Sequence, residues 1–100
     1  MNSKQRSYLK GLAVNLDTIF QVGKSGVSNE TAHQILNALE ARELIKIKVL
    51  ETSPQSVKDV SNELSLKTGA EVVQTIGTKI VLYKVSSNEK NRKIDISKIK

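Results

Sequence analysis

The 100-residue sequence contains no cysteine and a single histidine, His33. Without cysteine the chain has no disulfide framework, no thiolate nucleophile and no cysteine metal site. One histidine excludes a histidine metal cluster within the chain and argues against a Ser-His-Asp triad. His33 falls off the apolar stripe of the helix that we predict around it, so we expect a surface residue and assign it no role.

Long apolar runs and nucleotide fingerprints are also missing. No run approaches the roughly 20 residues that a membrane-spanning helix needs, and the first ten residues lack the apolar core of a signal peptide. The phosphate-binding loop motif GxxxxGK[ST] and the dinucleotide-binding motif GxGxxG are both absent. We therefore expect a cytoplasmic protein without a membrane partner, a small-molecule substrate, a metal or a cofactor.

Aromatic residues are scarce, with Tyr8, Phe20 and Tyr83 as the three examples. We expect both tyrosines in the core or at its edge rather than as platforms for nucleobases. So few aromatics argue against recognition of nucleic acid by stacking. If the chain binds nucleic acid, phosphate contacts and shape should provide most of the affinity.

Positive charge is in excess. Sixteen Lys and Arg residues against ten Asp and Glu residues give a net charge of +6 and a pI near 9.7. In a small domain this balance points first to nucleic acid as the partner. Residues 86–100 carry half of the excess and few large apolar groups, so we interpret them as a basic, flexible tail. The tail either adds electrostatic affinity for a polyanion or only increases solubility.

Apolar periodicity predicts one domain over residues 1–85 with the element order α-β-α-β-α-β-β. Helices are expected over residues 2–14, 28–42 and 53–68, and strands over residues 18–22, 44–50, 71–76 and 79–85. Two strand–helix–strand units followed by a hairpin predict an α/β, two-layer fold with a mixed four-stranded sheet.

Local signals define several ends of these elements. Ser28 is the predicted N-cap of the second helix. Ser53 followed by Pro54 has the form of an N-cap and a first helical residue, so we expect the third helix to begin there. Gly69 stands where a left-handed C-cap belongs. The loop Gly77–Thr78, with glycine first, fits a type II′ hairpin turn.

The four residues Gly23, Lys24, Ser25 and Gly26 join a predicted strand to a predicted helix N-terminus. Glycines allow a ligand backbone to approach closely, and the amides at a helix start attract an anion. Lys24 adds a positive charge at the tip. The GXXG loop of KH domains clamps a nucleic-acid backbone in this way. A tight turn that needs glycine only for its geometry would have the same pattern, so both interpretations stay open.

A second candidate site is the strand over residues 44–50, where Lys46 and Lys48 share one face. They form either a basic strip beside the glycine loop or an ordinary solvated strand face.

Several stretches together resemble one known family. They are QRSYLKGLA at 5–13, VGKSGV at 22–27, ELIKIKV at 43–49, TGAEVVQTIG at 68–77 and VLYK at 81–84. These blocks resemble the CRM domain, named for chloroplast RNA splicing and ribosome maturation, in its stand-alone bacterial form, the YhbY type. The resemblance covers about residues 3–85, without an insertion between blocks.

The resemblance implies an RNA-binding domain with a βαβαββ core behind an added N-terminal helix. Its fold is expected to be similar to the C-terminal domain of translation initiation factor three. The implied partners are ribosomal RNA and ribosomal particles, namely precursors of the large ribosomal subunit. The family's GxxG loop falls on residues 23–26, and its basic surface is expected to include Lys46, Lys48, Lys4, Arg6 and Lys10.

The sequence thus predicts a non-catalytic RNA-binding protein that assists assembly of the large ribosomal subunit. One alternative is a ribosome-binding factor that acts during translation. Another is a protein–protein adaptor whose basic charge is incidental. An enzyme such as a nuclease is disfavoured, because the sequence has no carboxylate cluster at metal-binding spacing and no histidine pair.

Overall fold

The computed structural model describes residues 1–99, so Lys100 of the predicted tail lies outside the described residues. The helices are α1 (Ser3–Ala13), α2 (Asn29–Arg42) and α3 (Val57–Thr68), and the strands are β1 (Thr18–Val22), β2 (Leu44–Val49), β3 (Glu71–Ile76) and β4 (Lys79–Tyr83). The strands form one sheet in the order β1-β2-β4-β3, in which only β1 and β2 run parallel. This arrangement confirms the predicted α/β fold with a mixed four-stranded sheet.

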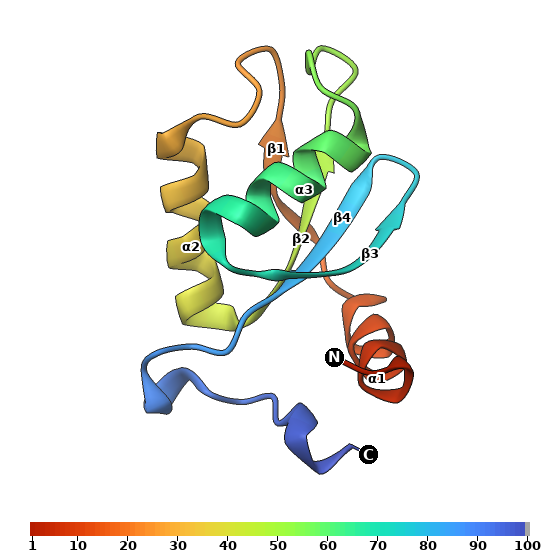
Figure 1. Cartoon of the computed structure of the whole chain (residues 1–100), viewed down its shortest axis with the longest axis vertical. Helices are drawn as coiled ribbons and strands as arrows, with labels where there is room; N and C mark the ends of the chain where they lie inside the picture. Colours follow the sequence, from red (N-terminus) through yellow and green to blue (C-terminus); the bar gives the residue numbers. More distant parts are fainter. Residues whose placement is uncertain (100) are drawn as a thin grey trace.

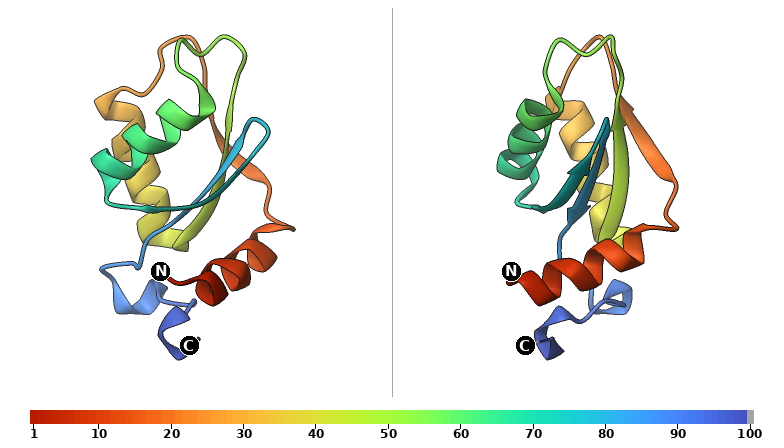
Figure 2. Two further views of the ribbon diagram at one scale, coloured as in Figure 1. Left: turned by 45° about the vertical axis from the view of Figure 1, so that its right-hand side comes forward. Right: turned by 90° about the vertical axis from the view of Figure 1, so that its right-hand side faces the viewer.

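The sheet is covered unequally on its two faces. Helices α2 and α3 pack on one face, whereas α1 lies across one end of the other face (Figures 1 and 2). Ile45 and Ile47 of β2 point into the larger core under α2 and α3. Leu44 points to the opposite side and packs with Leu9 and Ala13 of α1. Alternation along β2 therefore supplies both cores.

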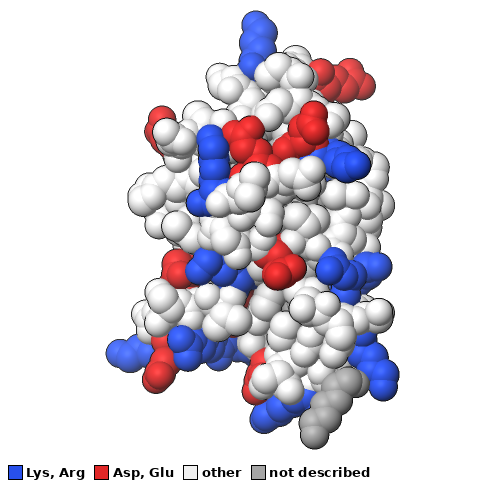
Figure 3. Space-filling model, in the orientation of Figure 1, with Lys and Arg blue, Asp and Glu red and all other residues white. Residues whose placement is uncertain are grey.

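The outer surface formed by α2 and α3 carries both charge signs. Basic and acidic side chains alternate over the face seen in Figure 3, without a large region of one sign. None of the helices within residues 1–99 is long and apolar enough to cross a membrane.

Two local turn predictions are confirmed. Gly69 caps α3 with φ = 76°, in the left-handed region where glycine is favoured. At the hairpin Ile76 pairs with Lys79, which leaves a two-residue loop. Gly77 has φ = 58° and Thr78 has no positive φ, the combination that a type II′ turn requires.

The predicted start of α3 is wrong. Ser56, rather than Ser53, is the N-cap, and its hydroxyl oxygen accepts a hydrogen bond from the Asp59 N–H at 3.1 Å. The Ser53 hydroxyl instead bonds both backbone groups of Gln55, accepting from the N–H at 3.2 Å and donating to the carbonyl at 3.0 Å. This local turn keeps Pro54 outside the helix.

The two tyrosines differ from each other. Tyr83 is buried in the smaller core, as predicted. Tyr8 is 45% exposed and lies outside both cores, which contradicts its predicted place in or beside the core. The helical stripe of α1 that faces the sheet passes through Leu9 and Ala13 and leaves Tyr8 outside.

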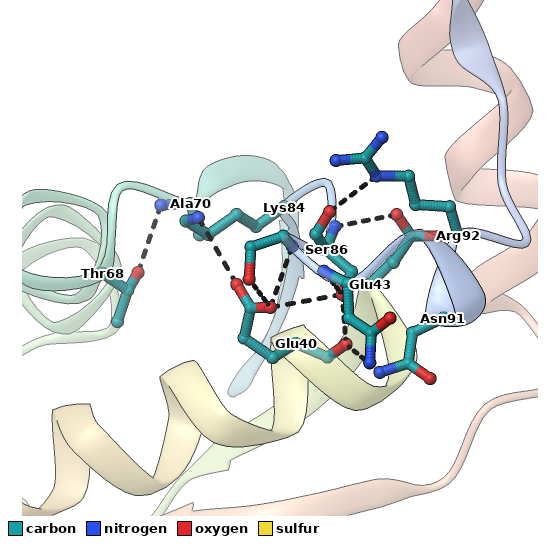
Figure 4. Close-up of polar contacts among 10 residues, drawn as sticks. Glu40, Glu43, Thr68, Ala70, Lys84, Ser86, Asn91 and Arg92 are labelled. Atoms are coloured by element: carbon teal, nitrogen blue, oxygen red, sulfur yellow. Dashed lines mark hydrogen bonds and ion pairs between the residues drawn. The ribbon is translucent and has the colours of Figure 1, made fainter.

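Residues 86–99 lie against the end of the domain formed by α1 and the C-terminus of α2. Figure 4 shows the fully buried carboxylate of Glu43 among backbone groups of this segment. One Glu43 oxygen accepts from the Ser86 N–H at 2.9 Å, and the other accepts from the N–H groups of Lys93 at 2.8 Å and Ile94 at 3.2 Å.

Glu40, one helical turn before Glu43, binds the same segment. Its carboxylate accepts from the Ser87 N–H at 2.9 Å and from the Ser87 hydroxyl at 2.6 Å. These hydrogen bonds lower the pKa of Glu40 below its ordinary value. Ile94 and Ile96 pack against the smaller core. The described part of the predicted tail is thus docked on the domain, while its flexibility stays a prediction.

Candidate nucleic-acid interface

Two loops lie side by side at one end of the molecule (Figures 1 and 2). The glycine loop, residues 23–26, connects β1 to α2, and the second loop, residues 50–56, connects β2 to α3. Because β1 and β2 are parallel neighbours, their C-terminal ends meet at the same edge of the sheet. A hydrogen bond of 2.8 Å from the Leu50 N–H to the Val22 carbonyl joins the two loops where they leave the sheet.

Both glycines of the glycine loop face the second loop. A Cβ added to Gly23 would lie 3.3 Å from Leu50 Cδ1 and 3.3 Å from Thr52 Oγ1. Gly26 has φ = 64°, and a Cβ there would lie 3.1 Å from Gln55 Oε1. Packing between the loops therefore gives both glycines a geometric reason, while the close approach of an RNA backbone to Gly23 and Gly26 stays a prediction.

The tip of the glycine loop points outward. Lys24 and Ser25 are exposed, and the loop is closed behind them by a hydrogen bond of 2.9 Å from the Gly26 N–H to the Gly23 carbonyl. Within residues 1–99, no protein acceptor bonds the backbone N–H of Lys24 or Ser25. The tip thus offers two amides and one ammonium group, which are suitable donors for a phosphate.

The uncovered part of the sheet carries three lysines on one side. Directly opposite residues of an antiparallel pair share a face, and the register pairs Lys48 with Lys79 and Lys46 with Val81. Lys46 and Lys48 are half-buried, and Lys79 is exposed. Neither of the ion pairs found within the described chain includes any of these three lysines.

Lys48 lies near the glycine loop, because the parallel register places it beside Gln21 of β1. Gln21 is two residues before Gly23, where the loop begins. Lys79 was not predicted as a site residue. Its place beside Lys48 follows from the antiparallel pairing of β2 with β4. That pairing joins segments more than thirty residues apart, and no local pattern in the sequence reveals it.

The predicted basic residues of α1 lie elsewhere. Helix α1 is at the opposite end of the molecule from the two loops (Figure 1). Lys4 and Lys10 are exposed there. The Arg6 Nη1 donates to the carbonyl oxygens of Val72 at 2.6 Å and Val73 at 2.8 Å, where the register of β3 shifts. Arg6 therefore holds α1 against the irregular part of β3.

Comparison with known proteins gives consistent matches over nearly the whole chain. The model of the CRS1/YhbY (CRM) domain family matches residues 1–84. The chain is 46% identical over 90 residues to "Probable RNA-binding protein YqeI" of Bacillus subtilis, covering 90% of this chain and 94% of that relative. It is 37% identical over 90 residues to "RNA-binding protein" of Haemophilus influenzae, covering 90% and 91%.

A solved structure matches as well. The solution structure of the hypothetical protein SAV1595 from Staphylococcus aureus superposes with a TM-score of 0.76 at 41% sequence identity. The match covers 95% of this chain and 99% of that chain, so it includes the sheet and the helices that position both loops.

Proposed function

Because this chain belongs to the CRS1/YhbY (CRM) domain family, we propose that it binds RNA through the loop tip and the open face of the sheet. The proposed contact surface consists of Lys24 and Ser25 at the tip with Lys46, Lys48 and Lys79 on the sheet. The names of the two bacterial relatives support RNA as the ligand. Lys4 and Lys10 of α1 are a second, separate set of candidate phosphate contacts.

One observation carries this proposal. Lys48 and Lys79 stand directly opposite each other on neighbouring strands, and neither makes an ion pair within the described chain. Like charges at such positions destabilise a sheet. A bound polyanion compensates this repulsion and releases its own counterions on binding. The two facing lysines therefore destabilise the free protein, and a bound phosphate backbone would compensate their repulsion.

The proposed RNA is ribosomal RNA in precursors of the large ribosomal subunit, and the proposed role is non-catalytic assistance in assembly. Family resemblance supports this finer assignment. Sedimentation of cell extracts tests it: the assembly role predicts that the protein travels with precursors of the large subunit. Presence on mature ribosomes and polysomes alone would instead favour a factor that acts during translation.

RNA affinity measured at several salt concentrations tests the contact surface. Removal of one phosphate-binding cation should lower the slope of log affinity against log salt by about 0.7–0.9. We expect this decrease for Lys24→Gln, Lys48→Gln and Lys79→Gln. Lys58→Gln is the matched control, because Lys58 is exposed on α3, on the covered side of the sheet. Equal slopes for all four variants and the unmodified protein would contradict the proposed surface, whereas absence of RNA binding by the unmodified protein would favour a protein–protein adaptor.

A further inference from the structure

A ring of four polar contacts joins the end of the glycine loop to α3. The Val27 N–H donates to Gln55 Oε1 at 3.3 Å, and Gln55 Nε2 donates to Glu63 Oε1 at 2.7 Å. Glu63 Oε2 pairs with Lys67 Nζ at 2.9 Å, and Lys67 Nζ donates to the Val27 carbonyl at 3.5 Å. We call these four residues the Val27 ring.

Val27 is well placed to transmit this restraint to the loop. It follows Gly26 directly and precedes Ser28, the N-cap of α2, whose hydroxyl oxygen accepts from the Thr31 N–H at 3.0 Å. Its side chain is buried in the larger core. With both backbone polar groups bound to side chains as well, the direction in which the loop enters α2 is defined.

We propose that Gln55 is a positioning residue for RNA binding, which holds the glycine loop in its phosphate-binding conformation through the Val27 ring. This inference rests on the proposed function. Gln55 meets the loop at two points, since its Oε1 bonds Val27 and also lies beside Gly26, where a Cβ would approach it to 3.1 Å. The Gln55 amide serves both sides of the ring, because its oxygen accepts from a backbone N–H and its NH2 group donates to a carboxylate.

The α3 side of the ring provides a firm base. Val60 and Leu64 of α3 are fully buried, so the helix that carries Glu63 and Lys67 is anchored in the core. The hydrogen bond from Gln55, followed by that from Lys67, lowers the pKa of Glu63 below its ordinary value. The two shorter contacts lie on this side, and the two longer ones reach the loop.

The ring gives Lys67 a different role from Lys24. Lys67 stands close to the glycine loop, but its ammonium group is shared between Glu63 and the Val27 carbonyl. Its charge is already neutralised within the protein, so it should release no counterion when RNA binds. Loss of the ring should instead make the loop more variable, and ordering the loop on binding then costs affinity.

The test uses the full chain with Gln55→Ala and the matched control Gln34→Ala, an exposed glutamine on α2. Hydrogen exchange at the Val27 amide and RNA affinity at several salt concentrations are measured. We expect faster Val27 exchange in Gln55→Ala and an affinity lower by about threefold to tenfold, the size of one hydrogen bond. The factor should be the same at every salt concentration, because Gln55 is neutral. The control should leave both quantities unchanged.

Lys67→Met gives a second measurement. We expect weaker RNA binding with an unchanged salt slope, in contrast to Lys24→Gln. A slope lowered by about 0.7–0.9 would mean that Lys67 contacts phosphate directly and would overturn its assignment to the ring.

The two proposals fail in different ways. Absence of RNA binding by the unmodified protein refutes the proposed function. An unchanged Val27 exchange rate in Gln55→Ala refutes the positioning role whatever the RNA result. Faster exchange with undiminished RNA affinity refutes it too, because the loop conformation would then not limit binding.

Discussion

At the end of the molecule formed by α1 and residues 86–99, charged side chains bind backbone groups of the same chain. Arg6 holds two carbonyl oxygens of β3, and Glu43 holds three N–H groups of the C-terminal segment. At the loop end, Lys24, Lys48 and Lys79 make no ion pair within the described residues. Charged side chains therefore stabilise the fold at one end and leave unused donors at the other.

This difference shows why net charge alone does not define an interface. The chain carries +6 overall, yet Arg6 and Arg92 are both bonded to backbone oxygens, Arg92 through its Nε to the Ser86 carbonyl at 2.8 Å. A cation contributes to binding a polyanion when its donors face solvent and its charge has no partner. Substitution of the bonded residues at the α1 end should therefore affect stability, and substitution of the unpaired lysines at the loop end should affect RNA affinity.

The largest expected effect is at Glu43. Glu43→Ala leaves three N–H groups of the C-terminal segment without their acceptor, and we expect the free energy of unfolding to fall by about 3 kcal/mol. Chemical denaturation measures this decrease. RNA affinity of the folded protein should change little, because Glu43 lies far from the loops.

Glu89→Ala is the control for this substitution. Glu89 is exposed on the same segment, and its carboxylate makes no hydrogen bond within residues 1–99. If Glu43→Ala were no more destabilising than Glu89→Ala, the segment would not depend on the buried carboxylate, and the flexible tail predicted from the sequence would be the better description.

Arg6 and Lys10 provide the next test, because they are basic residues of one helix with different surroundings. Arg6→Met should lower the free energy of unfolding by about 1.5–3 kcal/mol, since it removes charge-assisted hydrogen bonds to two carbonyl oxygens. Lys10→Met should change it by less than about 0.5 kcal/mol, as an exposed substitution. Denaturation of both variants measures the difference.

RNA binding by the same two variants distinguishes a residue that stabilises the fold from one that contacts phosphate. We expect an unchanged salt slope for Arg6→Met. A lower slope would show that Arg6 also meets phosphate, as the sequence predicts.

The elements themselves were predictable because their signals are local. Alternation along residues 44–49 identified β2, and glycine at positions 69 and 77 identified a helix end and a hairpin. The start of α3 was not predictable from local signals, because Ser53 and Ser56 can both act as N-caps. In the structure Ser53 forms a turn with the backbone of Gln55, and the Gln55 side chain bonds Val27 and Glu63, which lie 28 and 8 residues away. The local pattern does not reveal these longer-range contacts.

The candidate site was predictable only in part, because some of its residues are brought together by contacts between segments distant in the sequence. Lys24 and Lys48 stand in local patterns, whereas Lys79 joins them through strand pairing. Arg6 stands three residues before Leu9 and seven before Ala13, on the face of α1 that packs on the sheet. Its hydrogen-bond partners in β3 lie more than sixty residues away, so the sequence does not identify them. Residues 86–99 show little apolar pattern, and backbone bonds to Glu40 and Glu43, which the sequence does not reveal, hold much of the segment.

A smaller expected effect on stability than those of Glu43 and Arg6 has the opposite sign and occurs at the loop end. Lys79→Gln removes the repulsion between facing ammonium groups, so the free energy of unfolding should rise by about 0.2–1 kcal/mol. The gain should be larger at low salt and shrink as salt screens the repulsion. Denaturation of the variant and of the unmodified protein at two salt concentrations measures both effects.

The same substitution should weaken RNA binding, so the two readouts move in opposite directions. At the α1 end the charged side chains stabilise the fold, and their removal costs stability. At Lys79 the charge costs stability in the free protein, and only a bound polyanion compensates it. Lys58→Gln on α3 should change neither quantity appreciably. If Lys79→Gln lowered stability, or raised it without weakening RNA binding, the facing lysines would have no part in an RNA interface, and the contrast between the two ends would rest on Lys24 alone.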